Sequence, residues 1–362
     1  MSDQRGARLT RLAEALAEKN LDGLLITSLP NIRYLTGFSG SSALLFVTMR
    51  ETLLITDFRY KTQVAEEVGD LARVVIEAQS LWTGLWHLLP QVGGIHVIGF
   101  ESAHIHHRDF ERLLEAGGRW LWRPAVELVE SLRERKDPDE VALIRQAALI
   151  ATTALGEALP RIAPGMTELQ VAGLLEKSLR DAGSEDFPFS TIVASGPRSA
   201  LPHARCTARE IERDDLLLMD FGAMYRGYCA DVTRTVVVGR SDERQREVYE
   251  IVQTANATAS GAVRAGMRGR DADALARSYI ERRGHGDAFG HSLGHGLGLE
   301  VHEAPRLAKT ADAVLAPGSV VTIEPGIYLP GWGGVRIEDD VYLTADGVEV
   351  LTHFPRELLE VA

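Results

Sequence analysis

Short apolar runs and amphipathic stretches alternate along the first third of the chain, up to about Pro124. Leu9, Leu12 and Leu16 recur at helical spacing. Runs of strand length follow them, separated by further amphipathic stretches: LDGLLIT, SALLFVT, ETLLIT, ARVVIEA and HVIGF. Because short β-rich runs alternate here with helical periods, the pattern predicts a mixed α/β domain.

A charged stretch, ELVESLRERKDPDE, follows this region. Its charges disfavour burial, and its Asp137-Pro138 step is typical of a helix N-cap and first helical residue. The apolar pattern after it predicts a long helix, and Thr167 with Gln170 predicts a capping box for a second one. Beyond these two helices the chain becomes strand-rich, so the charged stretch marks a domain boundary.

Length and charge limit the class of protein. A chain of 362 residues exceeds what one core usually organises, so we expect two domains, at residues 1–130 and 131–362. The net charge of −12 repels phosphate backbones and anionic lipid, which makes nucleic-acid and membrane partners unexpected. We expect that no apolar run is long enough to cross a bilayer. The first twenty residues lack the apolar segment of a secretory signal. Cys206 and Cys229 form no CxxC pair and fit a reduced, cytoplasmic protein.

Two aspartates interrupt apolar strands in DDLLLMDFGAMYRGYCADVTRTVVVG, which reads as a β-hairpin. Whether the turn centres on residues 225–226 or 226–227, Asp220 and Asp231 are directly opposite or diagonal, and on one sheet face. A lone aspartate in a strand is usually an edge or turn residue. Two like charges on a buried hairpin repel each other unless a cation lies between them, so the pair favours a metal site.

Two later strand-like runs carry acids as well. Glu324 lies in SVVTIEPGIY, and Glu338 shares a face with Arg336 in GGVRIEDDVYLT. A solvated outer face would explain either run alone. Three histidines and three glycines lie between them and the hairpin, in HSLGHGLGLEVHE at 291–303. Four carboxylates with one or two imidazoles predict an oxygen-rich site, and so many negative charges indicate two divalent ions, with Mn²⁺, Co²⁺ or Zn²⁺ fitting the donors.

These motifs resemble the M24 metallopeptidases of the creatinase, prolidase and aminopeptidase P group. The order Asp, Asp, His, Glu, Glu, with the histidine in GHG and the glutamates in EPG and RIEDD, is similar to that group. NIRYLTGFSGS and TDFRY resemble its N-terminal domain. The resemblance implies an α+β protein, in which a C-terminal pita-bread catalytic domain is preceded by a smaller α/β creatinase-type domain.

The resemblance also implies roles for individual residues. The implied ligands of two divalent ions, Mn²⁺ first and Co²⁺ or Zn²⁺ otherwise, are Asp220, Asp231, His295, Glu324 and Glu338. Asp231 and Glu338 are expected to bridge the ions, which would activate a shared water and polarise the scissile carbonyl. Glu324 is expected to act as general base and acid.

Further residues are expected around the ions. His203 and His302 are expected to offset oxyanion charge, and His291 to line the substrate pocket. Arg336 is expected to touch substrate or to orient Glu338. The glycines of 294–298 are expected to let the backbone approach the metals.

The implied reaction is hydrolysis of the bond between an N-terminal residue and proline, in di- or oligopeptides. Arg306 matches a position that could hold a dipeptide carboxylate, which favours an Xaa-Pro dipeptidase (prolidase), and aminopeptidase P remains the alternative. A metal-free pita-bread protein that binds a peptide or partner is a remoter one. The extra domain of about 130 residues disfavours a methionine aminopeptidase. We expect a homodimer.

Two other signals receive structural explanations. The histidines of HIHHRD, beginning at His104, lack acidic partners at a matching spacing and predict a solvated loop or helix start. The tryptophans of the first domain predict packing in a core or at a subunit contact rather than a cofactor site, and they are Trp82, Trp86, Trp120 and Trp122.

Overall fold

The computed structural model describes residues 4–116 and 118–362. It divides into two compact units, Met1–Arg133 and Glu134–Ala362. The sequence placed this division three residues earlier.

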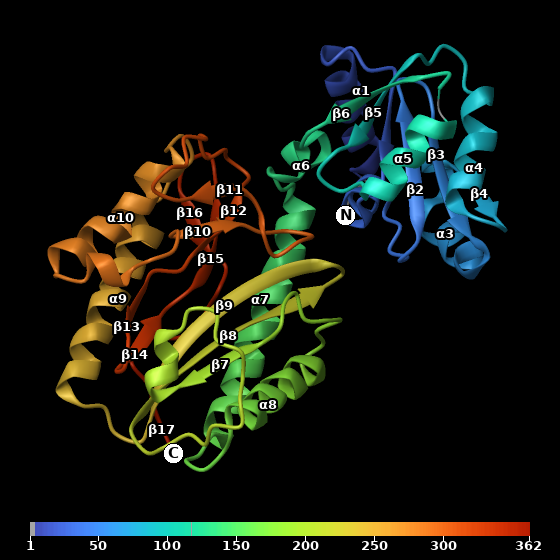
Figure 1. Ribbon diagram of the computed structural model, residues 1–362. Helices are drawn as coiled ribbons and strands as arrows, with labels where there is room; N and C mark the ends of the chain where they lie inside the picture. Colours follow the sequence, from blue (N-terminus) through green and yellow to red (C-terminus); the bar gives the residue numbers. More distant parts are fainter. Residues whose placement is uncertain (1–3, 117) are drawn as a thin grey trace. The chain divides into compact units, whose positions relative to one another are not determined.

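The first unit is built on a six-stranded sheet in the order β4-β3-β2-β1-β5-β6 (Figure 1). Only β2 runs antiparallel to its two neighbours, and the other pairings are parallel. The strands are β1 (Gly23–Ile26), β2 (Ala43–Thr48), β3 (Thr52–Asp57), β4 (Arg73–Glu77), β5 (Val97–Glu101) and β6 (Leu121–Ala125). The helices are α1 (Arg5–Glu18), α2 (Leu29–Thr36), α3 (Lys61–Val68), α4 (Leu81–Leu88), α5 (His107–Ala116) and α6 (Leu128–Arg133).

The central strands of this sheet are buried on both faces, which explains why their sequences are continuous apolar runs. Trp82, Trp86 and Trp122 pack against the same core, as the sequence predicted. His107 begins α5, which confirms the expected helix start. His104, however, has an acidic partner that sequence spacing did not reveal, because its Nε2 lies 2.8 Å from Glu130 Oε1.

The second unit contains three sheets. Their strand orders are β17-β9-β8-β7, β11-β10-β12-β15-β16 and β13-β14. The strands are β7 (Ile192–Ser195), β8 (Asp215–Tyr225), β9 (Tyr228–Val238), β10 (Gly294–Gly296), β11 (Glu303–Leu307), β12 (Val320–Ile323), β13 (Gly326–Leu329), β14 (Gly333–Arg336), β15 (Asp339–Leu343), β16 (Val348–Val350) and β17 (Glu360–Val361). The helices are α7 (Pro138–Ala158), α8 (Glu168–Asp181), α9 (Glu243–Ala262) and α10 (Gly269–Arg282).

Two apolar cores lie on either side of these strands. Figure 1 shows α9 and α10 along one side and α7 and α8 along the other. Asp137 caps α7 and Thr167 forms a capping box with Gln170 at the start of α8, as predicted, and Asp137 also forms a capping box with Glu140. The expectation that no apolar run is long enough to cross a bilayer needs correction, since Pro138–Arg161 meets that length and composition. More than half of its window is buried, so its packing as a core helix accounts for the composition.

The hairpin of β8 and β9 fixes the first two acids. Tyr225 pairs with Tyr228, so the turn centres on Arg226 and Gly227, whose φ values of 48° and 79° suit a two-residue hairpin turn. Asp231 pairs with Gly222, two positions along from the pairing of Asp220 with Thr233. The two aspartates are therefore diagonal on one face, which is one of the two predicted arrangements.

Candidate metal centre

The five predicted ligands come from five segments of the second unit. Asp220 and Asp231 lie in β8 and β9, and His295 lies in the short strand β10. Glu324 follows the last residue of β12, and Glu338 lies between β14 and β15. Both glutamates thus occupy strand breaks, where a side chain can leave the regular alternation of the sheet.

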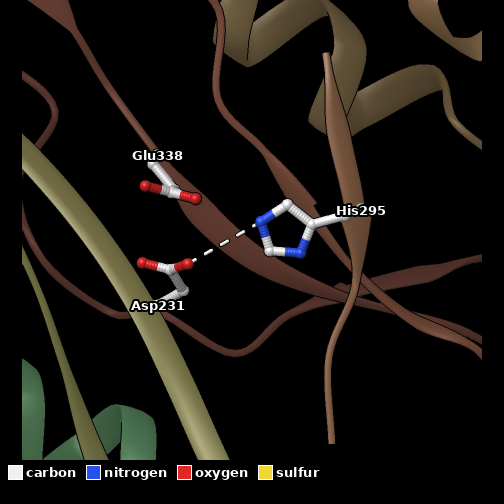
Figure 2. Close-up of side chains that lie close together, drawn as sticks. All are labelled: Asp231, His295 and Glu338. Carbon is white, nitrogen blue, oxygen red and sulfur yellow. Dashed lines mark ion pairs between the residues drawn. The ribbon is translucent and has the colours of Figure 1, made fainter. Parts of the chain in front are cut away.

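Three of these side chains meet most closely. Ligand atoms of Asp231, His295 and Glu338 all lie within 4.8 Å of one another (Figure 2). His295 Nε2 is 3.8 Å from Asp231 Oδ2 and 3.6 Å from Glu324 Oε1. The negative charge of Asp220 contributes to the raised pKa values of Asp231, Glu324 and Glu338, so the fifth residue belongs to the same cluster.

The electrostatics of the cluster are those of acids held together against repulsion. Burial and then the charge of Glu338 raise the pKa of Asp231 and of Glu324 well above the usual range. Burial and then the charge of Asp220 raise the pKa of Glu338 to about 8. In the described part of the chain, Asp220 Oδ1 and Asp231 Oδ1 are buried without a hydrogen-bond partner. Such orphaned oxygens among crowded acids fit a bound cation.

His295 is prepared to donate a lone pair to this cluster. Its Nδ1 lies 3.0 Å from the carbonyl oxygen of Gly296, which can only accept, so Nδ1 carries the proton and Nε2 faces the acids. Burial lowers the pKa of His295 to about 4, which keeps the ring neutral at pH 7. Four carboxylates and one neutral imidazole form a donor set that suits hard or borderline divalent ions.

The glycines beside His295 serve a different purpose from the one expected. A Cβ on Gly294 would lie 1.9 Å from the carbonyl oxygen of Thr322, and one on Gly296 would lie 2.1 Å from that of Ala304. Neither glycine has a positive φ. Glycine is required because the neighbouring strands β12 and β11 approach too closely for a side chain, and not because the backbone adopts angles that only glycine allows.

The other predicted histidines lie around the cluster. His302 is exposed, and its ring centroid is 4.4 Å from that of His295. His203 is also exposed, and it is close enough to contribute to the lowered pKa values of His302 and His291. His291 is half-buried, with Nε2 2.8 Å from Tyr328 Oη and Nδ1 3.8 Å from Glu324 Oε2. These three imidazoles therefore gather at one site.

Arg336 is buried and has a different main partner from the one predicted. Its Nη2 donates to Asp220 Oδ2 at 2.5 Å, and its Nη1 donates to Tyr328 Oη at 2.8 Å. It is connected to Glu338 through Thr233, whose hydroxyl accepts from Arg336 Nε and donates to Glu338 Oε2. The expected orientation of Glu338 is thus indirect. At 3 % exposure Arg336 presents little surface to a substrate.

Several residues that sequence reasoning missed hold this arrangement. Tyr328 links Arg336 to His291, and Asp340, fully buried, accepts the backbone N–H of Asp231 at 3.1 Å. On α10, Arg277 donates to the carbonyl oxygens of Phe289 and His291 while paired with Asp273. A spacing of four residues on a helix is also common for surface ion pairs, so nothing in the sequence indicated that this pair is buried.

Arg306 is exposed in β11, directly across from His295 in β10. Within residues 4–116 and 118–362 it forms no side-chain hydrogen bond or ion pair. Its charge contributes to the lowered pKa of both His295 and His302. A free cation therefore lies beside the cluster of acids and histidines.

Comparisons with known proteins agree with this geometry. The model of metallopeptidase family M24 matches residues 142–345, and that of the creatinase/prolidase N-terminal domain matches residues 8–135. An Xaa-Pro dipeptidase of Pyrococcus furiosus is 37 % identical over 97 % of this chain and 99 % of its own length. The solved Xaa-Pro dipeptidase from Bacillus anthracis is 39 % identical, with a TM-score of 0.94, over 99 % of this chain and all of its own.

A solved X-Pro aminopeptidase from Thermotoga maritima is similarly close, at 38 % identity and a TM-score of 0.90 over 98 % of this chain and 99 % of its own. The expected fold class is therefore confirmed, since the model of the N-terminal domain matches the first part of the chain and the model of the catalytic family matches the second. This chain belongs to metallopeptidase family M24 and carries the creatinase/prolidase N-terminal domain.

Proposed function

We propose that this chain is a metal-dependent Xaa-Pro peptidase, with Xaa-Pro dipeptides as its favoured substrates. The observation that carries the proposal is the convergence of Asp231, His295, Glu338 and their acidic neighbours around orphaned carboxylate oxygens. The Pyrococcus furiosus and Bacillus anthracis relatives named Xaa-Pro dipeptidase support the substrate class, because the chain aligns with nearly their whole length.

In this proposal the metal ligands are Asp220, Asp231, His295, Glu324 and Glu338. They would hold two divalent ions, with Mn²⁺ favoured and Co²⁺ or Zn²⁺ as alternatives. When bound, such ions supply Lewis-acid catalysis, since they polarise the scissile carbonyl and make an attacking water more acidic.

The protein's own groups handle the proton and the substrate oxygen. At 17 % exposure the Glu324 side chain is the most accessible of the four acids, so it is placed to accept the proton of the attacking water. It then passes that proton to the proline nitrogen, which leaves as a secondary amine. His203 and His302 are exposed beside the cluster and donate hydrogen bonds to the oxygen on which negative charge develops.

Arg306 favours the dipeptidase over aminopeptidase P. The carboxylate of an Xaa-Pro dipeptide belongs to the residue directly after the scissile bond, so it needs a cation close to the catalytic groups. Arg306 is exposed, unpaired within the described chain and opposite His295. A longer peptide would place an amide there and gain less from the charge. The Thermotoga maritima relative, named X-Pro aminopeptidase, keeps the second activity open as the alternative.

We further propose that the protein is a cytoplasmic homodimer without nucleic-acid or membrane partners. Two free cysteines suit a reducing compartment, and the net charge of −12 opposes binding to phosphate-rich surfaces.

A substrate assay on reconstituted enzyme tests the activity. The purified protein is stripped with chelator, given Mn²⁺, Co²⁺ or Zn²⁺ singly, and incubated with Leu-Pro or Leu-Pro-Gly, with products followed by chromatography. Turnover of Leu-Pro alone supports the dipeptidase. Preferential turnover of Leu-Pro-Gly assigns aminopeptidase P, and inactivity on both peptides with every metal refutes the peptidase proposal.

A further inference from the structure

The two glutamate ligands share a feature of their backbone. Glu324 follows Ile323 at the end of β12, and Glu338 follows Ile337 between β14 and β15. Each glutamate N–H is bonded to a different segment, Glu324 to the carbonyl of Leu293 and Glu338 to that of Thr233. The two breaks lie side by side in the sheet, because Ile323 pairs with Asp339, so a single group outside the sheet can bond to both.

One side chain does so. Asn256 Nδ2, on α9, donates to the carbonyl oxygens of Ile323 at 2.9 Å and of Ile337 at 3.1 Å. These oxygens belong to the residues directly before the two glutamates. Because both bonds end on a single nitrogen, the oxygens lie at most about 6 Å apart.

The surroundings of Asn256 make its presence costly. It is fully buried and lies on the face of α9 that packs into the apolar core, one helical turn after Val252. A buried amide is unfavourable unless its polar atoms are bonded, and Asn256 Oδ1 has no partner in the described chain. An apolar side chain would suit the helix face better. The feature that an apolar side chain lacks is the pair of N–H donors.

We propose that Asn256 is a positioning residue of the metal centre, which sets the spacing of the Glu324 and Glu338 backbones. This role rests on the proposed metal function. By holding both strand breaks with one amide, Asn256 keeps the two carboxylates in place before an ion binds, so that binding need not first order them. A residue that only joined α9 to the sheet would affect stability without a specific effect on ion affinity.

The test compares two variants of the full-length chain, Asn256→Ala and Val252→Ala. Val252 is buried on the same helix face, and its truncation removes packing without removing a hydrogen bond to either glutamate segment. Chelator-stripped proteins are titrated with Mn²⁺ by calorimetry and with Co²⁺ by visible absorption, and their metal-free unfolding midpoints are measured. We expect Asn256→Ala to weaken binding of at least one ion by about 10- to 100-fold. Val252→Ala should lower the midpoint and keep the affinity within about twofold of the wild type.

Asn256→Ser is a milder variant in case the alanine variant does not fold. It keeps one hydroxyl donor, which cannot reach both carbonyl oxygens, so its affinity for the ion should also fall. Wild-type affinity in the folded Asn256 variants, or an equal loss of affinity in Val252→Ala, would overturn the proposed role. Failure of the wild-type protein to bind either ion would instead remove the metal centre itself.

Discussion

Removal of one acid from the candidate metal centre should stabilise the metal-free protein. Glu338 is 2 % exposed, and burial followed by the charge of Asp220 raises its pKa from 4.5 to about 8. Between these two pH values the folded chain holds a proton that the unfolded chain has released. Folded-state proton binding then exceeds unfolded-state binding, so the stability of the metal-free protein falls as the pH rises from 4.5 to about 8.

The size of the effect follows from the same numbers. A rise of the pKa from 4.5 to about 8 corresponds to roughly 5 kcal/mol at about 1.4 kcal/mol per tenfold change in acidity. In Glu338→Gln the charge is absent, but the carboxamide brings a buried N–H group that costs about 1–3 kcal/mol if it stays unpaired. The side-chain oxygen can still accept from Thr233. We therefore expect a net gain of about 2–4 kcal/mol above about pH 8.

Denaturant unfolding of the chelator-stripped proteins measures this gain. Glu338→Gln should be more stable than the wild type at about pH 8.5 and no more stable at about pH 4.5. Glu250→Gln, an exposed change on α9, should match the wild type at both pH values. Saturating Mn²⁺ should reverse the order at the higher pH, because the wild type regains a complete ligand set. A variant that is less stable than the wild type at both pH values would show that Glu338 is not held against repulsion.

Four further substitutions test two residues of the site and one buried ion pair. Asp231→Asn should lower bound metal, measured by atomic absorption, and Leu-Pro turnover by at least about 100-fold, and normal metal content would contradict its assignment as a ligand. Arg306→Met should raise KM for Leu-Pro by about 10- to 100-fold and change KM for Leu-Pro amide little; equal effects on both peptides would count against carboxylate binding. Lys136 and Glu303 form a 3.0 Å ion pair whose side chains are 1 % and 7 % exposed. Lys136→Met should cost about 3–5 kcal/mol of unfolding free energy, and adding Glu303→Gln should restore part of it; no recovery in the double variant would mean that lost packing dominates.

Features that depend on neighbouring residues in the sequence were predicted well. The N-cap of α7 and the capping box of α8 involve residues at most three positions apart, and a two-residue turn limited the β8–β9 hairpin to two registers, one of which the structure has. The candidate ligands could be named because each lies in a short motif of its own, such as GHG, EPG or RIEDD. Local steric and hydrogen-bonding preferences, together with resemblance, were sufficient for these.

Contacts between distant segments were predicted poorly. The sequence pattern puts Arg336 on the same strand face as Glu338. In the structure β14 ends at Arg336 and β15 begins at Asp339, and the Arg336 side chain bonds to Asp220, 116 residues away. Asn256 and the pair of Asp273 with Arg277 lie on amphipathic helices, and nothing local distinguishes them from solvated polar residues. Their burial and their partners depend on which strands the helices cover.

The sequence by itself indicated two domains, the hairpin that brings Asp220 and Asp231 to one sheet face, and the oxygen-rich donor set that suits divalent ions. Only the tertiary structure decided which amide and guanidinium groups hold the segments and side chains of those acids, and why Gly294 and Gly296 cannot carry side chains. The physical reason is that side-chain chemistry and turn geometry are local properties. The free energy of a buried charge or an orphaned amide depends on atoms that folding brings together from distant parts of the chain.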